Sequence, residues 1–124
     1  MAKKMHDSVP DAMIDKIATA TRLVVTSAEP ANFAGIAAVA LADVVMTAGI
    51  GGGDYTKADG DTSGRKITVA QQSAVPIDSS GTATHVCLDD GTTLLYVTTC
   101  TSQALTAGGT VTVPAWDGEI ADPT

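Results

Sequence analysis

The segment from Gly81 to Ile120 constrains the fold most strongly, because it alternates strand-forming residues with turn signals. Thr, Val, Leu and Tyr dominate it, and the pairs Asp90-Gly91 and Gly108-Gly109 interrupt it. β-Branched and aromatic side chains fit a pleated, half-buried surface, and an Asp-Gly pair favours a tight hairpin turn. We therefore expect three antiparallel strands, near residues 82–88, 93–100 and 110–116.

Asp90-Gly91 predicts a hairpin between Thr82–Leu88 and Thr93–Cys100, with these two residues as its loop. In that register Leu88 faces Thr93. One face, assigned to the core, then carries Val86, Leu88, Leu95 and Val97. The opposite face is also apolar and carries His85, Cys87, Leu94 and Tyr96. It needs a cover, for which we consider an N-terminal helix, a second sheet and a neighbouring subunit.

The remaining sequence predicts one domain, 1–124, because this length supports a single core. Asp7 or Ser8 can cap a helix over residues 8–21, whose apolar stripe of Val9, Met13 and Ile17 should dock on the sheet. We divide the chain into an N-terminal arm (1–7), the helix (8–21), a β-rich body (22–120) and a tail (121–124).

Within the body, short apolar runs bounded by turn residues predict further strands. The Ala-rich segment 31–42 fits either a loose helix or an irregular cover, and the Gly-rich segment 49–53 predicts a loop without the Lys-Ser/Thr of a phosphate-binding motif. Pro76 should confine its strand to a sheet edge. The expected strands are Arg22–Thr26, Val44–Thr47, one at Tyr55, Arg65–Ala70 and Ala74–Asp78.

Composition sets the fold class and excludes several partners. The apolar residues are mostly Ala and Val, and only four residues are aromatic, so we expect a core of small side chains. We expect a mainly β protein, a small antiparallel β-sandwich or barrel-like domain with one N-terminal amphipathic helix packed on it. A net charge of −7 argues against nucleic acid and anionic membranes. Without a signal sequence or a long apolar run, the chain is expected to be soluble and made in a cytoplasm.

The residues that carry chemistry do not combine into a recognisable site. Cys87 and Cys100 lie roughly 20 Å apart in the predicted register, so we expect free thiols, with an intermolecular bridge through Cys100 as the alternative. His85 is two residues from Cys87, but no third group orients such a pair, and we interpret it as a packed structural histidine. His6 has no partner that the sequence identifies.

Three aspartates near a glycine turn, Asp54, Asp59 and Asp61, offer oxygen ligands for a hard cation. They lack the ligand order and the distal Glu of an EF-hand, so we favour a solvated turn. Asp89 and Asp90 are likewise interpreted as turn residues. The sequence thus predicts no enzyme, no metal site and no cofactor.

Three segments carry a family resemblance, together with the opening Asp7-Ser8-Val9: Ala58–Val69, Gly81–Tyr96 and Leu105–Trp116. They resemble small structural proteins of tailed bacteriophages and prophages. The resemblance covers about three quarters of the chain and consists of strand and turn patterns. It implies a β-rich virion protein, made in the bacterial host cytoplasm, and carries over no catalytic residue.

Such a role suits a small acidic domain with an extra apolar face, because many weak contacts add in a repetitive assembly. We expect a capsid decoration (cement) protein that binds the major capsid protein or other virion subunits on the outer head shell, as a trimer or similar small homo-oligomer. The expected contacts lie in the arm, the glycine loop and the start of the tail: Ala2, Lys3, Lys4, Gly51, Gly52, Asp54 and Trp116.

Two alternatives remain open at this point. One is a neck, collar or tail-associated subunit, including a connector for fibres. The other is a host-receptor or carbohydrate-binding β-sandwich, for which the β portion offers Tyr55, Tyr96 and Trp116 as aromatic contacts.

Overall fold

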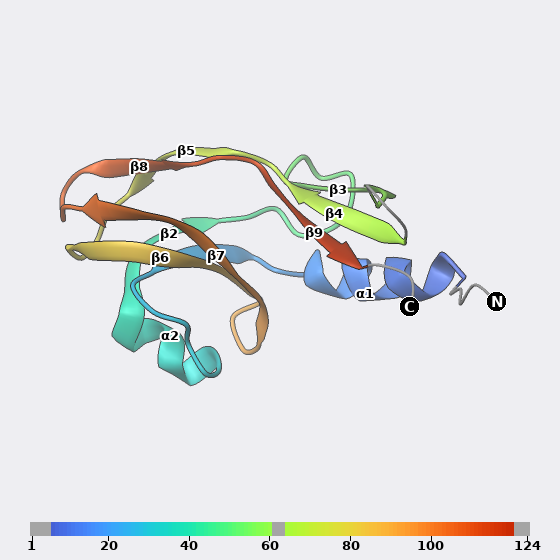
Figure 1. Cartoon of the computed structure of the whole chain (residues 1–124), viewed down its shortest axis with the longest axis horizontal. Helices are drawn as coiled ribbons and strands as arrows, with labels where there is room; N and C mark the ends of the chain where they lie inside the picture. Colours follow the sequence, from blue (N-terminus) through green and yellow to red (C-terminus); the bar gives the residue numbers. More distant parts are fainter. Residues whose placement is uncertain (1–5, 61–63, 121–124) are drawn as a thin grey trace.

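A four-stranded antiparallel sheet forms one layer of the computed structural model, which describes residues 6–60 and 64–120 (Figure 1). Its central strand β1 pairs with β2 on one side and with β6 on the other, and β6 continues into β7 through a hairpin. In sheet order the strands are β2 (Ala40–Val45), β1 (Arg22–Thr26), β6 (Gly81–Asp89) and β7 (Leu94–Leu105).

Two smaller sheets form the second layer. A three-stranded sheet has the order β3 (Tyr55–Asp59), β4 (Arg65–Val69) and β9 (Trp116–Ile120), and a two-stranded ribbon joins β5 (Gln72–Pro76) to β8 (Thr110–Val113). Figure 1 shows β5 and β8 facing the four-stranded sheet, while β3, β4 and β9 extend over helix α1 (Ser8–Ile17). These antiparallel layers and the packed N-terminal helix confirm the predicted fold class.

The main core lies between the two layers. Its largest fully buried side chains come from both layers and from α1, and include Tyr55, Ile14, Leu23, Ile67 and Leu88. Tyr55 is 0% exposed and donates a hydrogen bond from its hydroxyl to the carbonyl oxygen of Ala20 at 2.9 Å. That bond satisfies the one polar atom of the side chain. Burial, followed by the charge of Asp54, raises the pKa of Tyr55.

The hairpin register differs from the prediction. Leu88 faces Tyr96, Cys87 faces Val97 and Asp89 faces Leu94, with irregularities between Leu88 and Asp89 and between Ala83 and His85. The predicted pairing was wrong because the connection is longer than two residues. The predicted faces change with it: Tyr96 lies beside Leu88 on the core face, and Val97 lies opposite Cys87 on the other face. The Asp90 carboxylate accepts hydrogen bonds from the backbone N–H groups of Thr92 and Thr93, at 3.0 and 2.7 Å, and these bonds lower the pKa of Asp90.

The predicted docking face and end of the N-terminal helix were also wrong. Helix α1 ends at Ile17, with Asp7 at its N-cap position, and buries Pro10 and Ile14. Val9 and Met13, which were expected to dock, are 48% and 50% exposed. Burial of Pro10 and Ile14 sets the face that the helix turns to the core. Ion pairs from Asp11 to Arg65 at 2.7 Å and from Asp15 to Lys57 at 3.0 Å join it to β4 and β3.

Several strand boundaries were predicted correctly and others were wrong. The strands at Arg22–Thr26, Tyr55 and Arg65–Val69 are confirmed, and β5 lies at an edge as Pro76 indicated. The Ala-rich segment divides into helix α2 (Phe33–Val39) and β2, so β2 begins four residues earlier than expected. The last predicted strand is two strands, because β8 ends at Val113 and β9 pairs with β4 instead of continuing the ribbon.

The second face of the hairpin is covered by α2. Figure 1 shows α2 on the side of the four-stranded sheet opposite β5 and β8. Ile36 of α2 is buried, as are Val24 and Cys87 of the sheet, and none of the three belongs to the main core cluster. The cover that the apolar face requires is therefore supplied within the chain, by the segment whose structure the sequence left ambiguous.

Candidate interaction edge at strands β7 and β8

Strands β7, β8 and β9 each end a sheet, so each has one paired edge and one unpaired edge. Among the described residues β7 pairs only with β6, β8 only with β5, and β9 only with β4. Most side chains from Thr99 to Ala104 of β7 are exposed. An unpaired edge presents a row of backbone N–H and C=O groups that can pair with another chain.

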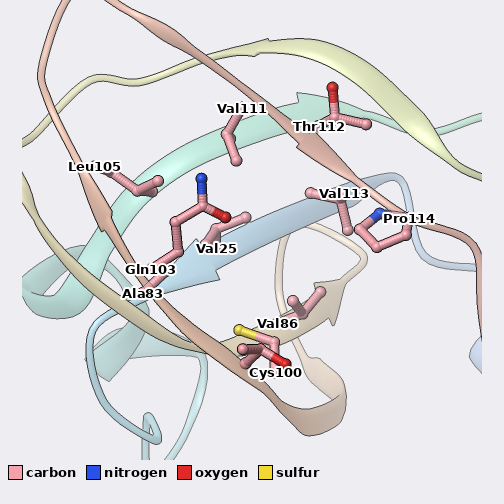
Figure 2. A pocket seen from close by; sticks show the side chains of 11 residues that line it. Val25, Ala83, Val86, Cys100, Gln103, Leu105, Val111, Thr112, Val113 and Pro114 are labelled. Carbon is pink, nitrogen blue, oxygen red and sulfur yellow. The ribbon is translucent and has the colours of Figure 1, made fainter.

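A groove separates β7 from β8, and its floor is the core face of the four-stranded sheet (Figure 2). Its larger hollow has a volume of about 170 Å³ and is apolar apart from a few neutral polar groups. A second hollow of about 140 Å³ continues it, since the two share Val86, Cys100, Val113 and Pro114. The two layers are therefore packed at their centre and open along this side.

Along β7 and β8 the lips of the groove lack charge, and the one charged residue of the described chain that lines it is Asp117, at the end of the second hollow. Residues 91–116 contain no Asp, Glu, Lys, Arg or His, in a chain with seven basic and fourteen acidic side chains. Natural edge strands are usually protected from pairing by charged side chains or by proline. Strand β7 has neither, and Pro114 follows β8 instead of lying within it. The pairing of β7 with β6 is however irregular between Thr99 and Gln103, where three residues lie opposite Thr84, and such a bulge interrupts the edge at this point.

An aromatic pair closes one end of the groove. Trp116 stacks on Tyr96 with ring centroids 5.6 Å apart and an angle of 28° between the planes. Gly118 permits this approach, because a Cβ atom there would lie 3.0 Å from the Tyr96 hydroxyl oxygen. Trp116, an expected contact residue, is thus half-buried, and its Nε1 is buried without a hydrogen-bond partner among the described residues.

The other expected contact residues lie elsewhere. Gly51 and Gly52 are exposed, and Gly51 has a φ of 87° that suits glycine. The Asp54 carboxylate accepts from the backbone N–H of Thr47 at 2.6 Å and from the Gln72 amide at 3.2 Å, so it anchors the end of this loop. The predictions for Ala2, Lys3 and Lys4 fall outside the described residues.

The aspartates considered as cation ligands are separated. Asp54 makes the bonds above, and the Asp59 carboxylate pairs with Arg65 at 2.6 Å. Asp61 lies outside the described residues. Within residues 6–60 and 64–120, no group of three acidic, histidine or cysteine side chains is arranged to hold a metal ion.

Both cysteines are free, in agreement with the prediction, although the geometry is different. Cys87 lies opposite Val97, only three residues from Cys100, but Cys87 is on the α2 side and Cys100 lines the groove. Burial raises the pKa of both thiols. His85 is half-buried with Nδ1 2.8 Å from the Thr84 hydroxyl, and His6, for which no partner was expected, has Nδ1 2.9 Å from the Ser8 hydroxyl.

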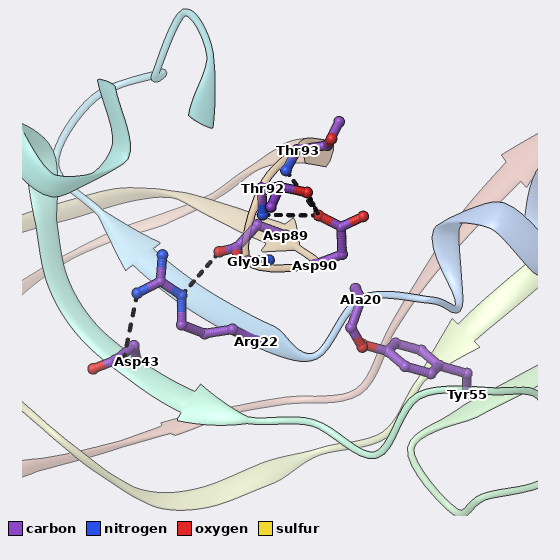
Figure 3. Close-up of polar contacts among 9 residues, drawn as sticks. All are labelled: Ala20, Arg22, Asp43, Tyr55, Asp89, Asp90, Gly91, Thr92 and Thr93. Atoms are coloured by element: carbon purple, nitrogen blue, oxygen red, sulfur yellow. Dashed lines mark hydrogen bonds and ion pairs between the residues drawn. The ribbon is translucent and has the colours of Figure 1, made fainter. Parts of the chain in front are cut away.

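Polar contacts link β1, β2 and the end of β6 in the four-stranded sheet (Figure 3). Asp89 is 0% exposed, and its carboxylate accepts from Arg22 Nε at 2.9 Å and from the backbone N–H of Gly91 at 3.0 Å. Arg22 also lies 3.9 Å from the Asp43 carboxylate. Sequence reasoning assigned Asp89 to turn chemistry and missed the ion pair, whose partners are far apart in the chain.

The edge itself was not identified from the sequence. Its pattern was nevertheless visible as the uncharged run 91–116, which spans both lips of the groove. In the described part of the chain, no helix is long and apolar enough to cross a membrane. Comparison with protein-family models, curated proteins and solved structures finds no match to this chain.

Proposed function

We propose that this protein is a structural subunit of a tailed-bacteriophage particle, bound in many copies to the outer shell of the head as a decoration protein. The observation that carries the proposal is the uncharged, unpaired edge at β7 and β8, which is suited to binding protein and not a small charged substrate. The strand and turn patterns resemble those of phage structural proteins, and for this reason we propose that the binding partner is part of a phage particle.

A decoration protein needs contacts with the shell as well as with its neighbours. We assign the shell contact to the arm with Ala2, Lys3 and Lys4 and to the loop with Gly51 and Gly52, which is exposed and lies outside the edge. The arm brings two positive charges to a chain with a net charge of −7. Many copies of one weak contact then add their free energies across the particle.

Copy number in purified particles tests the role. Decoration of the head predicts a copy number comparable to that of the major capsid protein, measured by quantitative gel densitometry, with density on the outer shell in electron micrographs. Far fewer copies, located at the neck or tail, would support the alternative neck or tail-associated role and contradict decoration.

A binding assay tests the arm. Shells lacking this protein are mixed with the wild-type chain, with the double variant Lys3→Ala/Lys4→Ala, or with Lys16→Ala, which removes an exposed lysine from α1. The arm proposal predicts reduced co-sedimentation of the double variant and wild-type binding of the Lys16 control. Equal binding by all three would contradict it.

The carbohydrate-binding alternative has less support. Tyr55 is fully buried, and Tyr96 and Trp116 stack on each other instead of presenting a free aromatic platform. We therefore propose that this protein binds other proteins of the particle and not a carbohydrate.

A further inference from the structure

We propose that the groove between β7 and β8 binds a small neutral molecule, with an apolar body of about two ring-sized units and one group that hydrogen-bonds to the Gln103 amide. The two hollows of the groove form the site. This site is independent of the virion role, because it is defined by the lining of the groove alone.

The irregular pairing of β7 with β6 shapes the site. Three residues of β7, Cys100 to Ser102, lie opposite the single residue Thr84 of β6. Consecutive residues of a regular strand point to opposite faces, yet Cys100 and Thr101 both line the larger hollow. Bulges redirect side chains in this way and are frequent next to active sites. The irregularity that interrupts the edge therefore contributes to the wall of the hollow.

The volumes of the hollows set the size of the ligand. They are about 170 and 140 Å³, and the hollows are continuous because they share four lining residues, Val86, Cys100, Val113 and Pro114. A dry apolar cavity of about 150 Å³ holds one benzene molecule. Each hollow thus has room for one ring-sized unit, and the open side of the groove lets the ligand enter.

The larger hollow combines an apolar lining with one polar group directed into it. Val25, Ala83 and Val86 line it from β1 and β6, so an apolar body gains free energy by leaving water. Figure 2 shows the Gln103 amide directed into this hollow, near Leu105. Among the described residues, that amide makes no hydrogen bond. An amide both donates and accepts, so it can bind an N–H, hydroxyl or carbonyl group of the ligand and fix its orientation.

Charge selects a neutral ligand. The chain has a net charge of −7, and among the described residues no basic side chain lines either hollow. The Asp117 carboxylate, at the second hollow, already contacts Lys66 and the Thr68 hydroxyl. An anion would lose its hydration here without meeting a counter-charge, and a cation would meet no carboxylate in the larger hollow.

Fluorescence titration of the full chain with N-phenyl-1-naphthylamine tests the site, because this neutral dye has two ring systems and one N–H group and fluoresces when it leaves water. We expect saturable binding of one dye molecule per chain. Its sulfonate, anilinonaphthalene sulfonate, should bind about tenfold more weakly or worse, since the groove offers no counter-charge. No binding of the neutral dye, or equal binding of the two, would overturn the proposal.

Three variants locate the dye. Ala83→Val fills part of the larger hollow and should weaken binding about tenfold. Ala104→Val makes the same change at an exposed residue of β7 that lines neither hollow, and should bind like the wild type. Gln103→Met removes the amide and should weaken binding about threefold. Thermal melts establish that all three are folded. Equal affinity of Ala83→Val and Ala104→Val would reject the site, and unchanged binding by Gln103→Met would reject the role of the amide.

Thiol alkylation locates the dye independently. Cys100 lines both hollows, whereas Cys87 is buried and lines neither. Saturating dye should slow the reaction of Cys100 with iodoacetamide, measured by peptide mass spectrometry, about fivefold or more. An unchanged rate would place the dye elsewhere and reject the site. An apparent affinity that falls as the protein concentration rises would mean that a second copy fills the groove, which also rejects it.

Discussion

Among single residues, Arg22 lies between a fully buried carboxylate, that of Asp89, and a half-buried one, that of Asp43. Asp89 is 0% exposed, and its carboxylate contacts Arg22 Nε at 2.9 Å and accepts a hydrogen bond from the Gly91 amide. Removing one partner of a buried pair costs far more than the pair contributes, since the other charge is left without compensation. Arg22 therefore fixes where β1 meets the end of β6 (Figure 3).

Asp43 gives a prediction with a pH dependence. Burial, and then a hydrogen bond with Asp78, raise the pKa of Asp43 above its ordinary value of 3.8. The folded chain therefore binds this proton more tightly than the unfolded chain does, and stability is lost as pH rises through the raised pKa. We expect Asp43→Asn to raise the melting temperature at neutral pH and to change it little at about pH 3, where both states are protonated.

Calorimetry of Asp43→Asn at the two pH values measures this difference. Glu29→Gln is the control, because it removes one negative charge from an exposed residue and should change the melting temperature little at either pH. A lower melting temperature for Asp43→Asn at neutral pH would mean that the Arg22 attraction exceeds the cost of burial and of Asp78.

At the scale of elements, α1 shows how tertiary contacts select one face of a helix. Val9, Met13 and Ile17 share a face by sequence spacing, yet Ile14 is 0% exposed while Val9 and Met13 are about half exposed. The ion pairs of Asp11 with β4 and of Asp15 with β3 are compatible with this rotation, which buries Ile14. The sequence shows these aspartates, but not the basic side chains that they reach.

Two alanine variants separate the predicted docking face from the observed one. Ile14→Ala should lower the free energy of unfolding by about 2–4 kcal/mol, because it leaves a cavity in the core. Met13→Ala should change it by about 0.5 kcal/mol or less, since half of that side chain is already in water. Urea unfolding measures both, and a larger loss for Met13→Ala would contradict the observed rotation of α1.

The elements that sequence reasoning located were those with a local pattern. Arg65–Val69 has the buried residues Ile67 and Val69 separated by the half-buried Thr68, and Pro76 marks an edge, so both elements followed from the local sequence. Strand β9 has the sequence WDGEI, with two charges and a glycine, and becomes a strand only through pairing with β4. The hairpin register depended on how Asp90 caps the loop, and an Asp-Gly pair alone does not show this.

For the whole molecule, the sequence was sufficient for the fold class but not for the site. Alternating strands, few aromatics and one amphipathic helix predicted antiparallel layers with a packed helix, and the structure confirms them. The groove forms because β7 and β8 end different sheets that meet along one side. That arrangement depends on strand order, which no local pattern in a single sequence specifies.

The open side of the two layers predicts that filling the groove stabilises the chain. Ala83 of β6 is buried and lines the hollow of about 170 Å³, so Ala83→Val adds two carbons where space exists and should raise the free energy of unfolding by about 1 kcal/mol. Ala42 of β2 is equally buried and lines neither hollow, so Ala42→Val should cost about 1–3 kcal/mol through overpacking. Urea unfolding compares the two variants. Destabilisation of both to the same extent would mean that the layers are closed at Ala83 and that the groove is absent in solution.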